Sequence, residues 1–499
     1  MSSSPLDRVY DEVSKCNRCG FCQSACPVYR VTGRESSTAR GHSYQVRSVL
    51  EGRLESSSGL SQPLFECLLC RACLPQCSPR VQTDRVVVAG RQALAGKKGC
   101  PGLLPFAFRR LLLNPRRLSR YASLLSVMKR TGVSRMAALA GGGPARAEGL
   151  LTQVPRQSLQ ERIKGMCLAP PSPKGRVAYF VGCGSNYLLP EVGEATIRVL
   201  VASGYAVEVT RNYCCGLPPY TYGDVATARR LAKGNLRLLD YQGVDAIVTD
   251  CASCSSFLKS YPQLLREDGA FAGSAEQMAK KVLDITEWLS HPGLREGDQA
   301  GPALPYGTPQ GAAVYPARKG GICSAGACPP LGQGGGGQAP ALQDEGGQIP
   351  ALQGERGQVP ALQDKRAELR RMGHAGAVAR PELPLTVTYH DPCHASRYQG
   401  LREEPRSLLR SVPGVNLLEM EEADWCCGGA GTYSVTHPDL AQRILDRKID
   451  NVERTGAQAL VTSCPSCMIH LSYGVRRRGL AVQVLHLTQV LEMACLGRS

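Results

Sequence analysis

The cysteines constrain this chain most, because they are numerous and regularly grouped. The 499 residues include 23 cysteines, and the stretches "NYCCGLPP" and "DWCCGGAG" each set two of them side by side before a glycine. The N-terminal "MSSSPLDRVYDEVSKC" lacks the apolar core of a secretion signal, and no apolar run approaches the roughly 18 residues that span a bilayer. We therefore expect a cytoplasmic protein whose thiols stay reduced and serve metal or redox sites rather than disulfides.

Two cysteine groups near the N-terminus predict iron–sulfur clusters. Both "CNRCGFCQSACP" and "CLLCRACLPQCSP" follow the C-x2-C-x2-C-x3-C spacing of two-cluster ferredoxins, in which the fourth cysteine serves the other cluster. One 4Fe–4S cube is thus assigned to Cys16, Cys19, Cys22 and Cys77, and the other to Cys26, Cys67, Cys70 and Cys73. Zinc is the alternative, but its usual two pairs of ligands fit these triple spacings poorly. The segment between the motifs looks helical, so residues 1–95 are predicted to form an α-helical ferredoxin domain.

The rest of the chain reads as a duplicated α/β module. Buried-strand patterns such as "RVAYFVGCG", "DAIVTD" and "LPLTVTYHDPCH" alternate with helical stretches. The chain contains the same three motifs twice and in the same order: a single cysteine, a Cys-Cys-Gly and a C-x2-C. Equivalent cysteines of the two copies are 210, 212 and 213 residues apart, which indicates a duplication. The prediction is an α+β multidomain protein with cysteine-rich modules at 176–292 and 381–499.

Each module carries five cysteines. The predicted ligands are Cys183, Cys214, Cys215, Cys251 and Cys254 in the first module, and Cys393, Cys426, Cys427, Cys464 and Cys467 in the second. A cubane needs one external ligand for each of its four irons, so one thiolate is surplus. Either one cysteine bridges two irons of a distorted cluster, or one stays free for redox chemistry, or the adjacent pair forms a vicinal disulfide. Each group follows a predicted strand, at the edge where open α/β sheets place their sites.

Two segments stand apart from these units. Residues 96–175 are predicted to be a basic helical linker, and 108–130 interleaves arginines with leucines. The net charge of +17 lies in the first third of the chain, since residues 1–180 hold 28 Lys+Arg against 10 Asp+Glu, and the remainder 31 against 32. This pattern fits an amphipathic helix that lies on an anionic membrane or an acidic partner, and it equally fits a solvated linker helix. A nucleic-acid partner is not expected. The repeats "GQAPALQ", "GQIPALQ" and "GQVPALQ" predict a disordered Gly/Pro/Gln-rich insertion over 293–380, where Cys323 and Cys328 are read as incidental.

The repeated C-x30-CCG-x34-C-x2-C pattern resembles the cysteine-rich CCG domain of heterodisulfide reductase subunits and respiratory iron–sulfur subunits. With the fused ferredoxin motifs, "CGFCQSACPVYR", "YHDPCHASR" and "CCGGAGTYSVTHPDL" make the chain most similar to iron–sulfur subunits of glycolate oxidase and related lactate oxidoreductases. The resemblance implies a separate FAD subunit that oxidises a 2-hydroxy acid, with electrons passing toward a membrane quinone. It also implies one or two further 4Fe–4S clusters of noncubane type, each held by five cysteines.

The resemblance also leaves an alternative. Because both five-cysteine sets are intact, a heterodisulfide reductase-like subunit that reduces a disulfide at the paired modules remains open. No G-x-G-x-x-G follows a predicted strand, so we expect the chain itself to bind neither FAD nor NAD. We also expect that the chain does not catalyse a reaction without its partner subunit. His390 and His394 flank Cys393 and are candidates to hydrogen-bond cluster sulfur or merely to pack. The expected location is cytoplasmic, with possible attachment to the inner face of the membrane.

Overall fold

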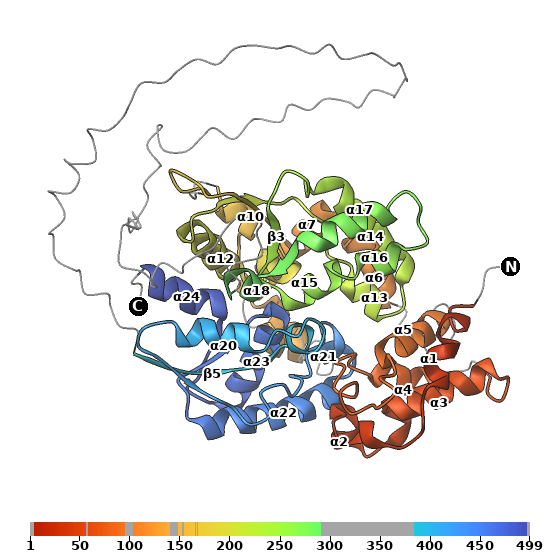
Figure 1. Cartoon of the computed structure of the whole chain (residues 1–499). Coiled ribbons are helices and arrows are strands. Elements are labelled where there is room, and N and C mark those ends of the chain that lie inside the picture. Colours follow the sequence, from red (N-terminus) through yellow and green to blue (C-terminus); the bar gives the residue numbers. More distant parts are fainter. Residues whose placement is uncertain are drawn as a thin grey trace, which may run out of the picture.

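The computed structural model describes residues 4–55, 58–94, 103–139, 148–151, 154–164, 166, 168–290 and 384–496. A helical N-terminal unit lies beside two α/β units, one above the other in Figure 1. Helices and two separate parallel sheets confirm the predicted fold class. The predicted insertion over 293–380, with Cys323 and Cys328, lies outside the described residues.

Short helices build the N-terminal unit, as its sequence predicts. The helices are α1 Tyr10–Ser14, α2 Pro27–Thr32, α3 Ala39–Leu50, α4 Ser61–Glu66 and α5 Thr83–Leu94, with 3-10 turns at Asp7–Val9, Phe21–Gln23, Glu35–Ser37 and Ser58–Leu60. The Thr38 hydroxyl accepts from the Gly41 N–H (3.2 Å) and so caps the start of α3. Val46, Leu64 and Val86 are buried and join α3, α4 and α5 in one core.

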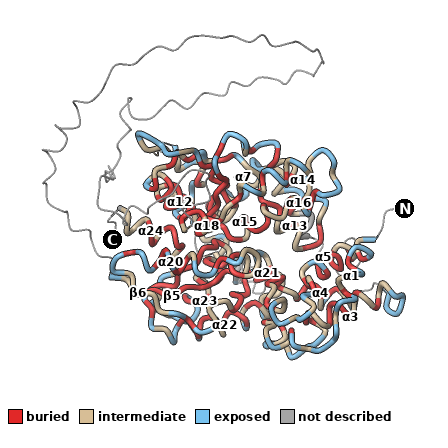
Figure 2. Tube along the Cα trace, in the orientation of Figure 1, coloured by how far each residue is buried: buried red, intermediate tan, exposed pale blue. Residues whose placement is uncertain are grey.

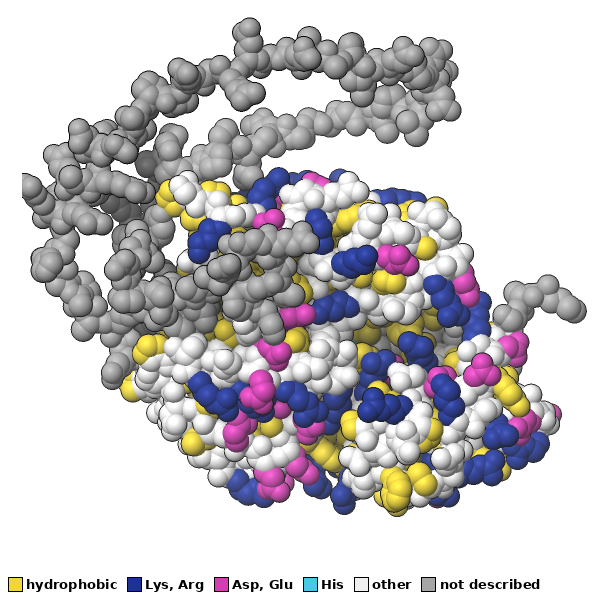
Figure 3. All heavy atoms as spheres, in the orientation of Figure 1, with side chains coloured by type: hydrophobic (Ala, Val, Ile, Leu, Met, Phe, Trp, Pro, Cys, Tyr) yellow, Lys and Arg dark blue, Asp and Glu magenta, His cyan; other side chains and the backbone are white. Residues whose placement is uncertain are grey.

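Helices also occupy the described part of the linker. They are α6 Leu103–Leu111, α7 Pro115–Arg130, α8 Val133–Leu139 and α10 Leu159–Arg162. Asn114 caps α7 by accepting from the Arg117 N–H (3.1 Å), so the basic stretch 108–130 is split between α6 and α7 rather than forming one helix. Tyr121, Leu124 and Val127 of α7 are more than half exposed. On the face shown in Figure 3, Lys and Arg side chains lie among Asp and Glu rather than in one large field.

The first α/β unit is a four-stranded parallel sheet in the order β2-β1-β3-β4. Its strands are β1 Arg176–Tyr179, β2 Ala206–Val209, β3 Ala246–Thr249 and β4 Val282–Asp284. Its helices are α11 Cys183–Tyr187, α12 Pro190–Ala202, α13 Leu217–Thr221, α14 Val225–Leu238, α15 Ala252–Leu258, α16 Tyr261–Leu265, α17 Ala272–Lys281 and α18 Ile285–Ser290. Every residue of β3 is buried, as expected for a central parallel strand covered on both faces.

The second α/β unit repeats this topology, with strand order β6-β5-β7-β8. Its strands are β5 Leu385–Tyr389, β6 Val415–Leu418, β7 Ala459–Thr462 and β8 Gln483–His486. Its helices are α19 Cys393–Ser396, α20 Glu403–Arg410, α21 Tyr433–Thr436, α22 Pro438–Thr455, α23 Pro465–Arg478 and α24 Leu487–Leu496. The same strand order in both units agrees with the duplication read from the cysteine offsets. We call the two units module 1 and module 2.

The modules share their core. Helix α12 of module 1 packs on α24 of module 2, and α20, the counterpart of α12, packs on α18, the counterpart of α24. Thr196 and Thr488 are hydrogen-bonded across this contact (3.2 Å). Both large apolar clusters draw residues from both modules, and buried segments meet between them in Figure 2. Such reciprocal packing is typical of a two-fold pair, and it turns the cysteine-bearing ends of the modules toward each other.

Candidate metal centres

The N-terminal unit holds two cavities lined by cysteines. One is lined by Cys16, Cys19, Cys22 and Cys77, and the other by Cys26, Cys67, Cys70 and Cys73. These are the groupings expected from the crossed fourth cysteine. Their role as cluster ligands stays a prediction.

The loops around the second cavity suit a cluster. Leu69 and Arg71 on either side of Cys70 have positive φ (54° and 56°), a conformation that non-glycine residues adopt rarely and mostly at functional sites. Backbone N–H groups of Leu69 and Ala72 donate toward the thiols of Cys67 and Cys70. Successive N–H groups in such turns form concavities that bind anionic iron–sulfur groups. The donor set therefore fits a 4Fe–4S cube.

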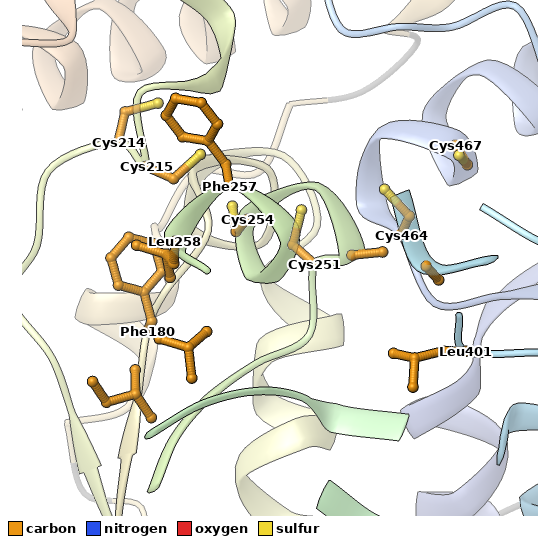
Figure 4. Packing of buried hydrophobic residues seen from close by; sticks show 14 of the residues in the cluster. Phe180, Cys214, Cys215, Cys251, Cys254, Phe257, Leu258, Leu401, Cys464 and Cys467 are labelled. Carbon is orange, nitrogen blue, oxygen red and sulfur yellow. The ribbon is translucent and has the colours of Figure 1, made fainter. Parts of the chain in front are cut away.

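Module 1 brings its five cysteines together at the carboxyl ends of its strands. Cys183 starts α11 after β1, the Cys214–Cys215 pair lies in the loop after β2, and Cys251 and Cys254 begin α15 after β3. The thiol contacts run from Cys183 to Cys214, from Cys215 to Cys254, and from Cys254 to Cys251. Figure 4 shows the side chains of Cys214, Cys215, Cys254 and Cys251 in sequence along this edge. The adjacent cysteines thus contact different neighbours.

Module 2 repeats the arrangement. Cys393 contacts Cys426, Cys427 contacts Cys467, and Cys467 contacts Cys464. The cysteines of both adjacent pairs are free thiols, so neither pair forms a vicinal disulfide in this structure. In each module the five cysteines are therefore joined by a series of pairwise thiol contacts.

Two contacts link these groups to each other. The Cys251 thiol of module 1 interacts with the Cys464 thiol of module 2, and Figure 4 shows the two on facing elements. The Cys70 thiol of the N-terminal unit interacts with Cys426 of module 2. Sulfur atoms therefore follow one another from the second N-terminal cavity through module 2 to module 1.

Several of these thiols favour the thiolate form. Hydrogen bonds from Cys214 and Cys254 lower the pKa of Cys215 to about 5. The pKa of Cys427 is lowered by Cys426 and Cys467, and that of Cys464 by Cys251 and Cys467. The thiolate is the form that binds metals, so these lowered pKa values favour metal binding at Cys215, Cys427 and Cys464.

Residues outside the cysteine motifs complete the site. Arg397 is nearly buried, pairs with Asp424 (3.2 Å), and lies near Cys70 and Cys426. Lys448 is fully buried and donates to the carbonyl oxygens of Glu422 and Ala423. The sequence analysis missed both residues, because nothing local marks a basic residue that folds inward. A comparison of equivalent positions in the two modules would have drawn attention to Arg397.

Gly428, which follows the cysteine pair of module 2, offers a stability test. It has φ +80°, and an added Cβ would lie 2.7 Å from the carbonyl oxygen of Ala441. Gly431 has φ +64° with nothing within 4 Å of an added Cβ, so it is a matched control. Both alanine substitutions incur about 1–2 kcal/mol of backbone strain, and Gly428→Ala adds a clash of about 1–3 kcal/mol. Urea unfolding should show this difference, and equal losses would contradict the packing described.

Comparisons with known proteins agree with this architecture. A family model described as a 4Fe-4S dicluster domain matches residues 12–81, and one described as a cysteine-rich domain matches residues 177–259 and 387–472. The chain is 26% identical over 497 residues to the probable glycolate oxidase iron–sulfur subunit of Bacillus subtilis, covering 96% of this chain and 93% of that protein. Over nearly its whole length the chain is thus similar to a glycolate oxidase iron–sulfur subunit. The Escherichia coli glycolate oxidase iron–sulfur subunit is 25% identical over 483 residues, with the same coverage of both chains.

A relative of different name also matches nearly the whole chain. One of the fumarate reductase (CoM/CoB) subunits of Methanothermobacter marburgensis is 23% identical over 490 residues, covering 96% of this chain and 72% of that protein. Relatives that match nearly the whole chain therefore carry names that refer to different reactions. Among the described residues, no helix has the length and apolar character that crossing a membrane requires.

Proposed function

We propose that this chain is the electron-transfer subunit of a flavin-linked oxidoreductase that acts on a 2-hydroxy acid such as glycolate or lactate. Its partner would be a separate FAD subunit, and the electrons would pass through this chain toward the membrane quinone pool. The proposal starts from the glycolate oxidase subunits to which the chain is similar. We further propose that the chain catalyses no reaction without its partner subunit.

The observation that carries the proposal is the buried, continuous path of sulfur atoms. From Cys70 the path reaches Cys426 of module 2, and from Cys464 it reaches Cys251 of module 1. Cys251 and Cys464 are only 6% and 1% exposed. Electrons can cross such packed protein, whereas a substrate would have to reach the sulfur atoms through it.

The residues that would hold the clusters are those of the two cavities and the two modules. Bound iron–sulfur clusters supply one-electron carriers at potentials that the protein sets. We assign four cysteines to each of two 4Fe–4S cubes in the unit 1–95, with Cys26 and Cys77 exchanged between the motifs. We assign five cysteines to a further cluster in each module, within the units 176–292 and 381–499. The chain's own part is to hold the thiolates, exclude water and fix the spacing.

The linker helices support a location at the inner membrane surface in this proposal. Helix α7 exposes Arg117 and Arg120 beside Tyr121 and Leu124. No Asp or Glu occurs between residues 103 and 147. Arginines beside exposed apolar side chains suit an anionic membrane surface.

Reduction of a disulfide between the modules is the second candidate. The contact of Cys251 with Cys464 favours it, because it brings the two five-cysteine sets face to face. Such a reaction would consume two electrons and two protons and release two thiols. The burial of both cysteines weighs against it, since a disulfide must touch the sulfur or iron that reduces it. Turnover of a disulfide by this chain with a reduced ferredoxin as donor would favour this candidate.

A titration of the anaerobically purified chain tests the proposal. We expect about sixteen irons per chain, with two EPR signals of cubane type and two of another type. Adding glycolate or lactate should reduce these centres only when the FAD subunit is present. Oxidation of glycolate by this chain alone with an artificial acceptor would contradict the relay. About eight irons with cubane signals only would mean that the module cysteines act as redox thiols.

A further inference from the structure

The modules share a backbone but differ at equivalent positions around their cysteines. With the offsets of 210 and 213 residues, Phe180 corresponds to His390, Tyr187 to Arg397, Asp250 to Ser463, and Phe257 to His470. By strand register, Asp284 opposite Thr249 corresponds to His486 opposite Thr462. Three aromatic residues of module 1 are replaced in module 2 by two histidines and an arginine. Two aspartates of module 1 are replaced in module 2 by a serine and a histidine.

His390 is the clearest of these differences. Its side chain is buried, and neither ring nitrogen has a hydrogen-bond partner among the described residues. A ring nitrogen of His390 and the Sγ atoms of Cys427 and Cys467 lie within 4.8 Å of one another. An unpaired buried imidazole is costly, so a group that accepts its N–H is expected at this position. Phe180, at the same position of module 1, is fully buried and offers no donor.

Charged residues differ in the same direction. In module 2, Arg397, which pairs with Asp424 (3.2 Å), lies near Cys393 and Cys426, and Lys448 lies near Cys426 and Cys427. Asp391 of that module is neutralised by Arg406, which donates to both of its carboxylate oxygens (2.9 Å each).

Module 1 has buried carboxyl groups instead. Asp250 directly precedes Cys251 and accepts from the hydroxyls of Tyr179 (2.7 Å) and Ser185 (3.0 Å). Asp284 accepts from Ser255 (3.0 Å), one residue after Cys254. Both carboxyl groups are fully buried, and their hydrogen bonds come from neutral side chains and backbone rather than from a basic group.

These surroundings set how easily each module accepts an electron. An added electron makes a cluster more negative, and nearby cations and hydrogen-bond donors stabilise that charge, whereas buried carboxylates and apolar walls oppose it. We propose that the modules form an ordered pair, in which His390 and Arg397 give module 2 the higher reduction potential and Asp250 gives module 1 the lower. This rests on the proposed binding of a cluster in each module. The contact of Cys70 with Cys426 then makes module 2 the first to exchange electrons with the N-terminal unit, one electron leaving that unit for each electron gained.

Exchanging equivalent residues tests this order, with His390 as a positioning residue. His390→Phe gives module 2 the residue that module 1 already holds there, and Phe180→His is the reciprocal variant. In an EPR-monitored redox titration of the full chain, we expect His390→Phe to lower the ratio of reduced to oxidised module 2 about tenfold, or about 59 mV for one electron. The module 1 signal should not move. Phe180→His should shift the module 1 signal upward.

Asp250→Asn provides a second route if either aromatic exchange fails to fold. It keeps the shape of the side chain and removes its charge, so the module 1 potential should rise by more than the module 2 potential. Unshifted potentials in variants with full iron content would overturn the ordered pair while leaving the relay intact. A wild-type chain without the two module signals would instead overturn the proposed clusters themselves.

Discussion

Replacing Cys427 with serine is expected to remove the cluster of module 2 and to stop electron transfer through the chain. Cys427 is buried and contacts Cys426 and Cys467, and hydrogen bonds from both lower its pKa. Serine is nearly isosteric, but its alkoxide is inaccessible at neutral pH, so one ligand is lost with little change in packing. Iron content should fall from about sixteen to about twelve per chain, and one of the two non-cubane EPR signals should vanish.

Cys495→Ser is the matched control for this substitution. Cys495 lies in α24, outside both five-cysteine sets, and is half-buried. Its replacement should leave iron content and every EPR signal unchanged. A Cys427→Ser chain that kept its full iron and both non-cubane signals would rule out five-cysteine binding in module 2.

Arg91→Met is expected to cause the largest loss of stability. Arg91 is 4% exposed and donates to the carbonyl oxygens of Leu64 and Cys67 in the N-terminal unit and of Thr221 in module 1. Methionine fills much of the same space but leaves three inward-facing carbonyl groups without this donor. At about 1–3 kcal/mol for each unsatisfied buried group, and with partial relaxation, the expected loss is about 3–5 kcal/mol in the free energy of unfolding. Urea unfolding followed by circular dichroism measures it.

The loss should also appear at the site. Arg91 holds the carbonyl of Cys67, a predicted ligand, so the EPR signal of that cubane should broaden or disappear in the same variant. Arg91→Lys should be intermediate, because one ammonium group cannot reach all three carbonyls in the geometry of a guanidinium. Arg30→Met is the control, since exposed Arg30 donates only to the Ser24 carbonyl and should cost less than about 0.5 kcal/mol. Similar losses of unfolding free energy in the Arg30 and Arg91 variants would contradict the stabilising role given to the three Arg91 hydrogen bonds.

Cysteine spacing and strand patterns were enough to predict much of this molecule. Two residues separate Cys16 from Cys19 and Cys19 from Cys22, so chain connectivity alone keeps the three within reach of one cavity. The predicted strands around 176–180 and 385–389 alternate with helices, which predicts parallel sheets with cysteines at their carboxyl edge. The same patterns predicted the duplicated module, because equal spacing implies equal topology. They also predicted the grouping of Cys77 with the first motif, through the spacing typical of two-cluster ferredoxins.

Only the tertiary structure decided how these units meet. Cys70 and Cys426 are 356 positions apart in the chain, and nothing local relates them or pairs Cys251 with Cys464. The inward direction of Arg91, Arg397 and Lys448 likewise depends on which carbonyls and thiols pack around them. The sequence by itself determined what each segment forms and which cysteines act together, because those depend on spacing over a few residues. The order of the sites and the charges around them depend on how apolar faces of distant segments pack, which no local pattern encodes.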